Sequence, residues 1–234
     1  DRDTGLRAFA ASNLQPGTAG QGGNILITAE SIELLEGGQL NSATQGVGDA
    51  GSITLNSNGV TLIDEGSIFS SIAANSQGTG GDIRINAGAL AAVNGGQIIS
   101  NSAGVGNAGD IVLTVSGETL FDGINADNNA LSVAASNILA SGQGNGGDIL
   151  ITTSDLALTE GGQLLANSLG QGDAGNIDVT VGQTALFSGV NARSGDSSGV
   201  ATTLLSGGQG AGGNIQISAR DVVIKELAQI SANS

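Results

Sequence analysis

The sequence predicts an all-β fold: a right-handed parallel β-helix, or single-stranded β-solenoid, with three short strands per rung and about eight rungs, where a rung is one turn of the coil. Three observations support this prediction: a glycine-led pattern recurs along the chain, apolar residues alternate with period two inside each repeat, and glycine-rich gaps separate them. Strands that repeat in this way pair in parallel with their equivalents in the next rung, and parallel crossovers are right-handed.

The recurring pattern is Gly, then Asn, Ser or Asp, then Ile, any residue, and finally Ile, Leu or Val. Successive copies lie 28, 30, 28, 38, 28 and 38 residues apart, and they begin at Gly23, Gly51, Gly81, Gly109, Gly147, Gly175 and Gly213. The residue before each of these glycines alternates between Gly and Ala. The structural unit is therefore a pair of repeats, and the second member of each pair is the one whose length varies.

These spacings predict a single β-helix over residues 1–234. We expect a partial rung at 1–22, full rungs at 23–50, 51–80, 81–108, 109–146, 147–174 and 175–212, and a partial rung at 213–234. Both ends of the sequence fall inside a repeat, and neither has the polar sequence typical of a solenoid cap. We therefore expect a segment of a longer repeat array.

Each repeat contains three strand-like stretches, as the first full repeat illustrates with Ile25 and Ile27, then Ile32 and Leu34, then Leu40. Alternate residues of a strand point to the same side, so each of these pairs shares one face. We expect two inward columns that run the length of the coil. They are Ile25, Ile53, Ile83, Ile111, Ile149, Ile177 and Ile215, and Ile27, Leu55, Ile85, Leu113, Ile151, Val179 and Ile217.

The composition excludes several functions. The chain has no Cys, Met, Trp, Tyr or His, so thiol, imidazole and phenol chemistry are absent. Its net charge of −15 repels nucleic acid and anionic lipid, and no apolar run is long enough to insert into a membrane. The six basic residues are scattered over unrelated repeat positions, and no pair of catalytic carboxylates is evident. We expect no enzyme, no catalytic residue and no cofactor.

One column of acids permits a metal site. Asp82, Asp110 and Asp148 occupy the same position in three consecutive repeats, and calcium prefers such oxygen ligands. Asn or Ser stands at this position in the other repeats, and short polar side chains of all three types bond backbone amides at tight corners. The corner role is the preferred interpretation, with calcium as the alternative.

The two repeats of 38 residues predict a contact surface. Eight residues more than in the repeat at Gly51 must leave the coil, and both excursions begin alike, at Leu120-Phe121 and Leu186-Phe187. We expect both loops at one corner, two rungs and about 10 Å apart. Strict alternation after inward Leu120 and Leu186 places both rings outside, each covered by its own loop. The candidate contact residues are Asp122, Asn125, Asp127, Asn128, Asn191, Arg193 and Asp196.

The alternating Gly-Gly-Asn-Ile and Ala-Gly-Asp-Ile starts, the Gly-Gly-Gln-Leu corner and the Ala-Asn-Ser stretch before a Gly-x-Gly turn resemble a known family. They are similar to the repeat arrays of filamentous-haemagglutinin-like exoproteins of the two-partner secretion type, especially those of cyanobacteria. The resemblance covers essentially the whole chain. It implies an extracellular or cell-surface stalk that is exported through an outer-membrane β-barrel transporter.

The expected function is a non-catalytic structural or adhesive segment of a large secreted exoprotein. It would act as a rigid rod for surface attachment or extracellular assembly, since solenoid stability adds up rung by rung. Expected partners are other copies or segments of the same array and components of the cell surface or extracellular matrix. The alternative is a polysaccharide-binding or polysaccharide-cleaving β-helix, because enzymes also use this fold.

Overall fold

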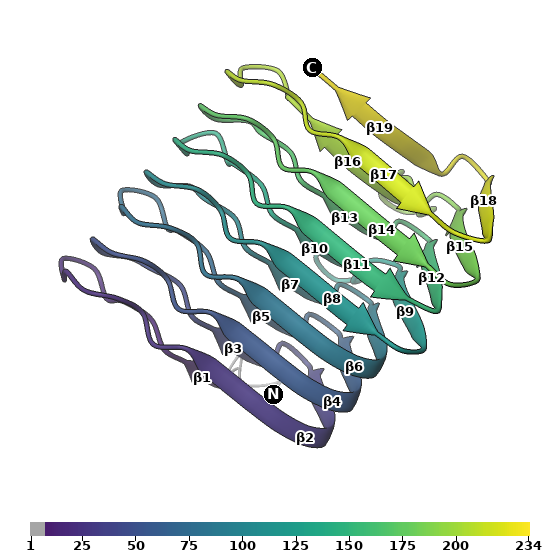
Figure 1. Cartoon of the computed structure of the whole chain (residues 1–234), viewed down its shortest axis with the longest axis horizontal. Coiled ribbons are helices and arrows are strands. Elements are labelled where there is room, and N and C mark those ends of the chain that lie inside the picture. The colour runs from purple at the N-terminus through teal and green to yellow at the C-terminus, as the bar shows by residue number, and fades with distance from the viewer. Residues whose placement is uncertain (1–7) are drawn as a thin grey trace.

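The structure, a computed structural model that describes residues 8–234, is a parallel β-solenoid of about eight rungs, as predicted (Figure 1). All pairings between its strands are parallel, and they join each strand to its equivalents in the neighbouring rungs. Residues 8–234 contain no helix that is long and apolar enough to cross a membrane.

Three faces of the coil are built from strands. The first and second faces form one 11-stranded sheet, and the third face is an eight-stranded sheet. The first face contains β2 (Ile25–Leu35), β4 (Ile53–Ile63), β6 (Ile83–Val93), β8 (Ile111–Val115), β11 (Ile149–Thr153), β14 (Ile177–Val181) and β17 (Ile215–Ser218). The second contains the later halves of β2, β4 and β6, and then β9 (Glu118–Asp122), β12 (Asp155–Thr159), β15 (Thr184–Ser188) and β18 (Asp221–Lys225).

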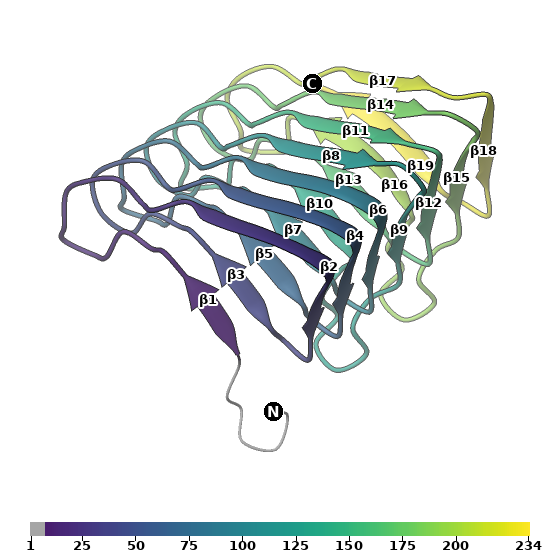
Figure 2. The same cartoon turned by 60° about the horizontal axis from the view of Figure 1, so that its bottom comes forward.

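The third face contains β1 (Phe9–Ala11), β3 (Gln39–Asn41), β5 (Ser67–Phe69), β7 (Gln97–Ile99), β10 (Val133–Ala135), β13 (Gln163–Leu165), β16 (Gly199–Thr203) and β19 (Gln229–Asn233). A glycine-rich arch closes each rung, and isolated parallel bridges such as Thr44 to Ile72 connect successive arches. In Figure 2 the arches and the three strand faces stack along one axis.

The first two strands of a rung are not always separate. In β2, β4 and β6 the backbone stays paired through the first corner, so one 11-residue strand bends across two faces. From β8 onward the strand is interrupted at this corner, where Ser116 and Gly117 stand in the first long rung. Three strand segments per rung are thus present throughout, with two of them fused in the early rungs.

The two inward columns are confirmed. Ile25 pairs with Ile53, and the register continues through the remaining five isoleucines to Ile215. In the middle rungs the members of both columns are at most 1% exposed, whereas those of the first and last rungs are partly buried. Removing each such side chain from water contributes about 1.5–3 kcal/mol, so the core is a sum of similar rungs.

The prediction for the two phenylalanines is wrong. The rings of Phe121 and Phe187 are 0% exposed and belong to the core, while Leu120 and Leu186 lie half-buried on the outer side. The cause is one extra residue at the first corner of the long rungs. Ile83 pairs with Ile111, and Leu90 pairs with Thr119. Leu90 follows Ile83 by seven residues, whereas Thr119 follows Ile111 by eight. A shift of one residue turns every following side chain to the opposite face.

The core accommodates these rings because the inward residue two positions earlier is small. Thr119 precedes Phe121 and Ala185 precedes Phe187, and all four side chains are fully buried. Rungs without a phenylalanine at this position fill the equivalent core space with two aliphatic side chains. Their inward pairs are Val60 with Leu62, Leu90 with Ala92, and Leu156 with Leu158. Close packing favours such compensation, since interiors have few voids.

Each rung begins at a crowded corner that explains the recurring glycine. A Cβ added at Gly81 would collide with the carbonyl oxygen of Gly51 in the rung below. In four rungs a serine donates to this carbonyl: Ser70 Oγ donates to Gly51 O at 2.8 Å, Ser100 Oγ donates to Gly81 O at 3.1 Å, and Ser42 and Ser136 do the same for Gly23 and Gly109. The glycine recurs in every rung, and the serine accompanies it up to Ser136, after which Ala166 and Thr202 take its position.

Candidate functional site

Two loops interrupt the regular surface at the corner between the second and third faces. The structure places ten residues, 123–132, between β9 and β10, and ten residues, 189–198, between β15 and β16. Only three residues, 64–66, make the same corner between β4 and β5. Figure 2 shows the two loops, one teal and one light green, leaving the coil on the same side. The predicted common corner is confirmed, although seven rather than all eight additional residues enter each loop.

Both loops are small hairpins with the same fold. An antiparallel bridge joins Ile124 to Leu131 in the first loop and Val190 to Ser197 in the second. The turn is held by an asparagine: Asn125 Oδ1 accepts hydrogen bonds from the backbone of Asp127 and Asn128. Asn191 Oδ1 does the same for Arg193 and Ser194. Such side-chain turns are typical of asparagine, so the shared Asn-Ala sequence explains the shared shape.

The loops form one continuous row along this edge. The Arg193 guanidinium of the second loop donates to the carbonyl oxygen of Ala126 in the first. In the other direction, Asn128 Nδ2 donates to Glu65 Oε1 at 2.6 Å. Side-chain contacts thus link three corners that are far apart in the sequence. We call residues 123–132 and 189–198 together the loop edge.

A hollow of about 200 Å³ lies beside the second loop, on the outer side of the third face. Gly199 is at its centre, where the paired strands carry Val133, Gln163 and Gln229. Beside the first loop the corresponding space is filled, because Val133 is only 5% exposed. At Gly199 the Gln229 carbonyl oxygen occupies the position that a Cβ would take, so this strand has no side chain where the first long rung has Val133.

The walls of this hollow combine apolar and polar groups. Leu165 and Ala201 supply apolar surface, and Asp196 is the one acidic residue among the lining side chains. Gln163 Nε2 donates to Ser197 O at 2.9 Å, which leaves Gln163 Oε1 as a free acceptor. Within residues 8–234, neither the Asp196 carboxylate nor the side-chain amide of Gln229 has a hydrogen-bond partner. A small hydroxyl-bearing ligand fits this chemistry, since amides and carboxylates both bond hydroxyl groups.

The structure separates the predicted contact residues into two groups. Asn125 is 4% exposed and, like Asn191, holds its hairpin turn instead of facing outward. Asp122 lies at the end of β9 and accepts a hydrogen bond from Thr159 Oγ1. The exposed tips carry Asp127, Asn128 and Arg193, and Asp196 borders the hollow.

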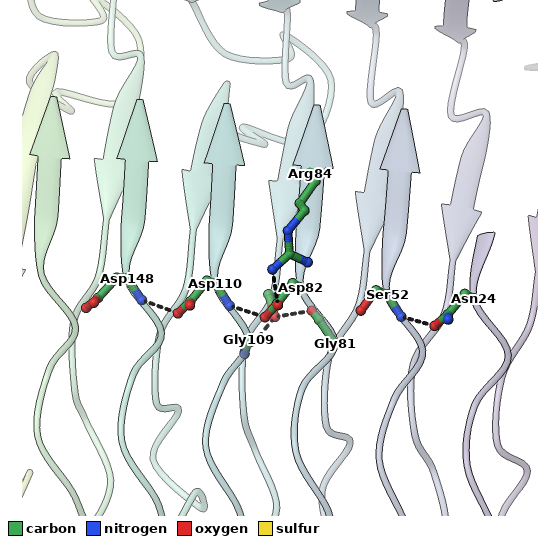
Figure 3. A network of polar contacts seen from close by, with 9 residues as sticks. Asn24, Ser52, Gly81, Asp82, Arg84, Gly109, Asp110 and Asp148 are labelled. Atoms are coloured by element: carbon green, nitrogen blue, oxygen red, sulfur yellow. Dashed lines mark hydrogen bonds and ion pairs between the residues drawn. The ribbon is translucent and has the colours of Figure 1, made fainter. Parts of the chain in front are cut away.

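The acidic column lies at a different corner, shown in Figure 3. Asp110 N donates to Asp82 Oδ1 at 3.0 Å, and Asp148 N donates to Asp110 Oδ1 at 2.9 Å. Asn24 accepts in the same way from Ser52 N at 2.8 Å. Each of these side chains thus bonds the backbone of the next rung, which is the corner role considered from the sequence.

The charges of this column are partly compensated. Arg84 Nη2 lies 2.7 Å from Asp82 Oδ2. Burial raises the pKa of Asp110, the hydrogen bond from the Asp148 backbone opposes this, and repulsion from the Asp82 and Asp148 carboxylates raises the pKa further. Within residues 8–234, no group of three or more acidic side chains is arranged to hold a metal ion. Calcium binding at Asp82, Asp110 and Asp148 stays a prediction.

Among the residues that line the hollow, the sequence pointed only to Asp196, and the strand residues were missed. A signal was available at Gly199, because Gln recurs at this repeat position as Gln39, Gln97, Gln163 and Gln229. A glycine within a strand marks a place where another group approaches closely. Comparisons of the chain with protein-family models, with curated proteins and with solved structures found no match.

Proposed function

We propose that this chain is a non-catalytic, rod-like segment that acts outside the cell or at its surface and makes contacts through the loop edge. The observation that carries the proposal is the combination of an unbroken parallel stack with two linked hairpins at one corner. Binding residues concentrate on loops that a rigid scaffold holds in place. The loop edge meets this description, since the strands on either side of each loop keep their register.

Stiffness supports the structural part of the proposal. Hydrogen bonds run along the axis on all three strand faces, and the arches add further bonds between rungs. At the corner before the first face, Asn24, Asp82, Asp110, Asp148 and Asn176 each accept a hydrogen bond from the backbone of the next rung; Asn176 accepts from Asn214 N at 3.0 Å. Bending the rod would break bonds on the stretched side, so the stack resists bending as a whole.

The place of action rests on the resemblance to two-partner secretion exoproteins. The absence of cysteine is compatible with a chain that crosses a membrane unfolded, and the net charge of −15 keeps such a chain soluble. Under this proposal the chain leaves the cell through an outer-membrane β-barrel transporter. Its partners are then other segments of the same array and components of the extracellular surface.

Saccharide binding is a second candidate, and the hollow at Gly199 favours it. Free amide and carboxylate groups lie there beside apolar Leu165 and Ala201. Cleavage is not part of this candidate, because glycoside hydrolysis needs two carboxyl groups about 5–9.5 Å apart and the hollow has one acidic residue. The expected activity is binding of one neutral sugar unit without turnover.

Loop replacement tests both candidates. In each variant Asp-Glu-Gly, the sequence of residues 64–66, replaces either 123–132 or 189–198. Both variants should keep the β-sheet circular dichroism signal, because the ladder lies outside the loops. Retention on immobilised matrix proteins and neutral polysaccharides should fall at least tenfold. Loss from the 189–198 replacement alone would indicate the hollow, and unchanged retention in both would leave the loops with a packing role only.

A further inference from the structure

The second strand face has an apolar outer surface that the proposed function does not use. One outward row of this face is apolar from the third full rung onward, and its members are Ala91, Leu120, Ala157, Leu186 and Val223. The neighbouring outward row begins with Ile63 and Val93 but continues with Asp122, Thr159 and Ser188. Register pairing places Leu120 beside Ala157 and Ala157 beside Leu186, so these three form one row across adjacent rungs. We call this apolar row, from Ala91 to Val223, the second face stripe.

Acidic residues border the stripe on both sides. At the first corner, Glu118 pairs with Asp155 of the next rung. The same repeat position is Thr184 in the following rung and Asp221 in the one after that. At the second corner an acidic residue with positive φ recurs at one repeat position, as Glu36, Asp64, Glu160 and Glu226. Asp122 adds a further carboxylate at the end of β9. Among the described residues of this face and its corners, two side chains are basic: Lys225 lies 3.8 Å from Glu226, and Arg220 at the first corner donates to Gln183 Oε1 at 3.2 Å.

A hollow in the stripe has a shape suited to a long cationic side chain. It has a volume of about 350 Å³ and is lined by Glu118, Asp155, Leu156, Ala157, Thr184 and Leu186. The small Ala157 makes the depression, because its row neighbours are both leucines. Lysine and arginine side chains carry an aliphatic stem and a charged head, so the stem would contact Ala157 and Leu186 while the head reaches Glu118.

We propose that the second face stripe binds a partner protein segment in which lysine or arginine residues stand beside aliphatic ones. Charge complementarity selects this occupant: acids line both borders, and the apolar row lies between them. A second copy of this chain is disfavoured, because it would bring the same acidic borders together and has only six basic residues. This surface lies on a different face from the hollow at Gly199, so the proposal does not depend on saccharide binding.

The test uses the full chain and a labelled 12-residue peptide that alternates lysine with valine, followed by fluorescence anisotropy. A peptide that alternates lysine with serine has the same charge and should bind at least tenfold more weakly. Binding of the lysine and valine peptide should weaken as salt is added, since exposed charges are screened. Equal affinity for both peptides would overturn the proposal, because only net charge would then matter.

Matched variants locate the site. Leu120→Lys with Leu186→Lys adds two positive charges to the second face, and Val112→Lys with Leu150→Lys adds two to outward positions of the first face. The first pair should weaken peptide binding at least tenfold relative to the second. Glu118→Gln with Asp155→Asn should also weaken it, and this pair leaves the apolar row intact.

Equal effects of the two lysine pairs would overturn the assignment to the second face. Sedimentation of the unmodified chain gives a further outcome. Self-association that only Leu120→Lys with Leu186→Lys abolishes, without peptide binding, would show that a second copy occupies the stripe and would also overturn the proposal. Circular dichroism of each variant confirms that the coil is folded.

Discussion

The rungs 109–146 and 175–212 have the same length and carry the same kind of loop, yet they present different surfaces. Both bury a phenylalanine, Phe121 or Phe187, and both fold their loop around an asparagine. They differ beneath the loop, where Val133 fills the space in one rung and Gly199 leaves a hollow in the other. A shared insertion therefore does not define a shared site, because one strand residue next to the loop decides whether the surface is open.

The comparison also shows why this corner tolerates an insertion. Asp122 pairs with Thr159 before the first loop, and Val133 pairs with Gln163 after it, so the parallel register is the same on both sides. The loop closes on itself through its own antiparallel bridge. Lengthening a surface loop costs little when its ends stay in place.

The largest effect is expected in the core beneath the loops. Phe121→Ala should lower the free energy of unfolding by about 3–5 kcal/mol, because it leaves a cavity in a close-packed layer. Phe187→Ala should cost a similar amount. Denaturant unfolding followed by circular dichroism measures both. The control is Thr119→Leu with Phe121→Leu, which copies the Leu156 and Leu158 pair and should cost less than about 1.5 kcal/mol. A loss below 1 kcal/mol for Phe121→Ala would mean that the ring is not in the core.

Exchanging the residues beneath the loops should come next. Gly199→Ala places a Cβ against the Gln229 carbonyl oxygen and should destabilise the chain by about 1–3 kcal/mol. Val133→Gly should cost about 1.5–3 kcal/mol in lost burial and open a hollow beside the first loop. Thermal unfolding measures the stabilities. A neutral Gly199→Ala variant would show that the strand can move away from Gln229.

The two turn asparagines should differ in a smaller way. Asn125→Ala leaves the backbone amides of Asp127 and Asn128 without their acceptor in a buried setting, so we expect a loss of about 1–3 kcal/mol. Asn191 is more exposed, and water can replace its oxygen, so Asn191→Ala should cost about 1 kcal/mol or less. Hydrogen exchange of the loop amides reports the turn directly, and Asn125→Asp keeps an acceptor as control. Equal losses would contradict the difference in burial.

The smallest effect concerns the second residue of each long rung, which is Asp110 in one and Asn176 in the other. The folded-state pKa of Asp110 is raised, chiefly by burial, so its carboxyl group destabilises the fold once it ionises. The protonated Asp110 carboxyl group therefore contributes its full stabilisation below the ordinary pKa of 3.8, and this stabilisation is lost as the pH rises through the folded-state pKa. Asp110→Asn keeps the acceptor and should stabilise the chain at pH 7 by about 0.5 kcal/mol, given solvent screening.

Thermal unfolding across a pH series checks this. The gain from Asp110→Asn should shrink as the pH falls and disappear below 3.8. Asn176→Asp in the other long rung makes the converse change and is the matched control. A gain from Asp110→Asn that does not vary with pH would rule out ionisation as its cause.

The sequence by itself predicted the coil, because its evidence is local and repeated. From Gly51 onward each glycine of the pattern lies against the carbonyl of the rung below, and each inward isoleucine pairs with its equivalent, so a repeat along the chain becomes a repeat in space. The corner that carries both loops followed from their shared starting sequence for the same reason. The bonds of Asp82 and Asp110 to backbone amides match the role that interchange with Asn and Ser suggested.

Only the tertiary structure decided which way the phenylalanines point and where the surface is open. One extra residue at the Ser116–Gly117 corner exchanges the inward and outward positions of β9, and no pattern within that rung predicts the exchange. The ring is inward because its neighbours in the rungs below and above, Ala92 and Leu158, are inward and parallel pairing aligns them. The hollow at Gly199 likewise depends on Gln163 and Gln229, which are 36 residues before it and 30 after it in the chain but adjacent in the sheet. Packing between rungs sets these features, and a single rung read alone does not contain the neighbours that determine them.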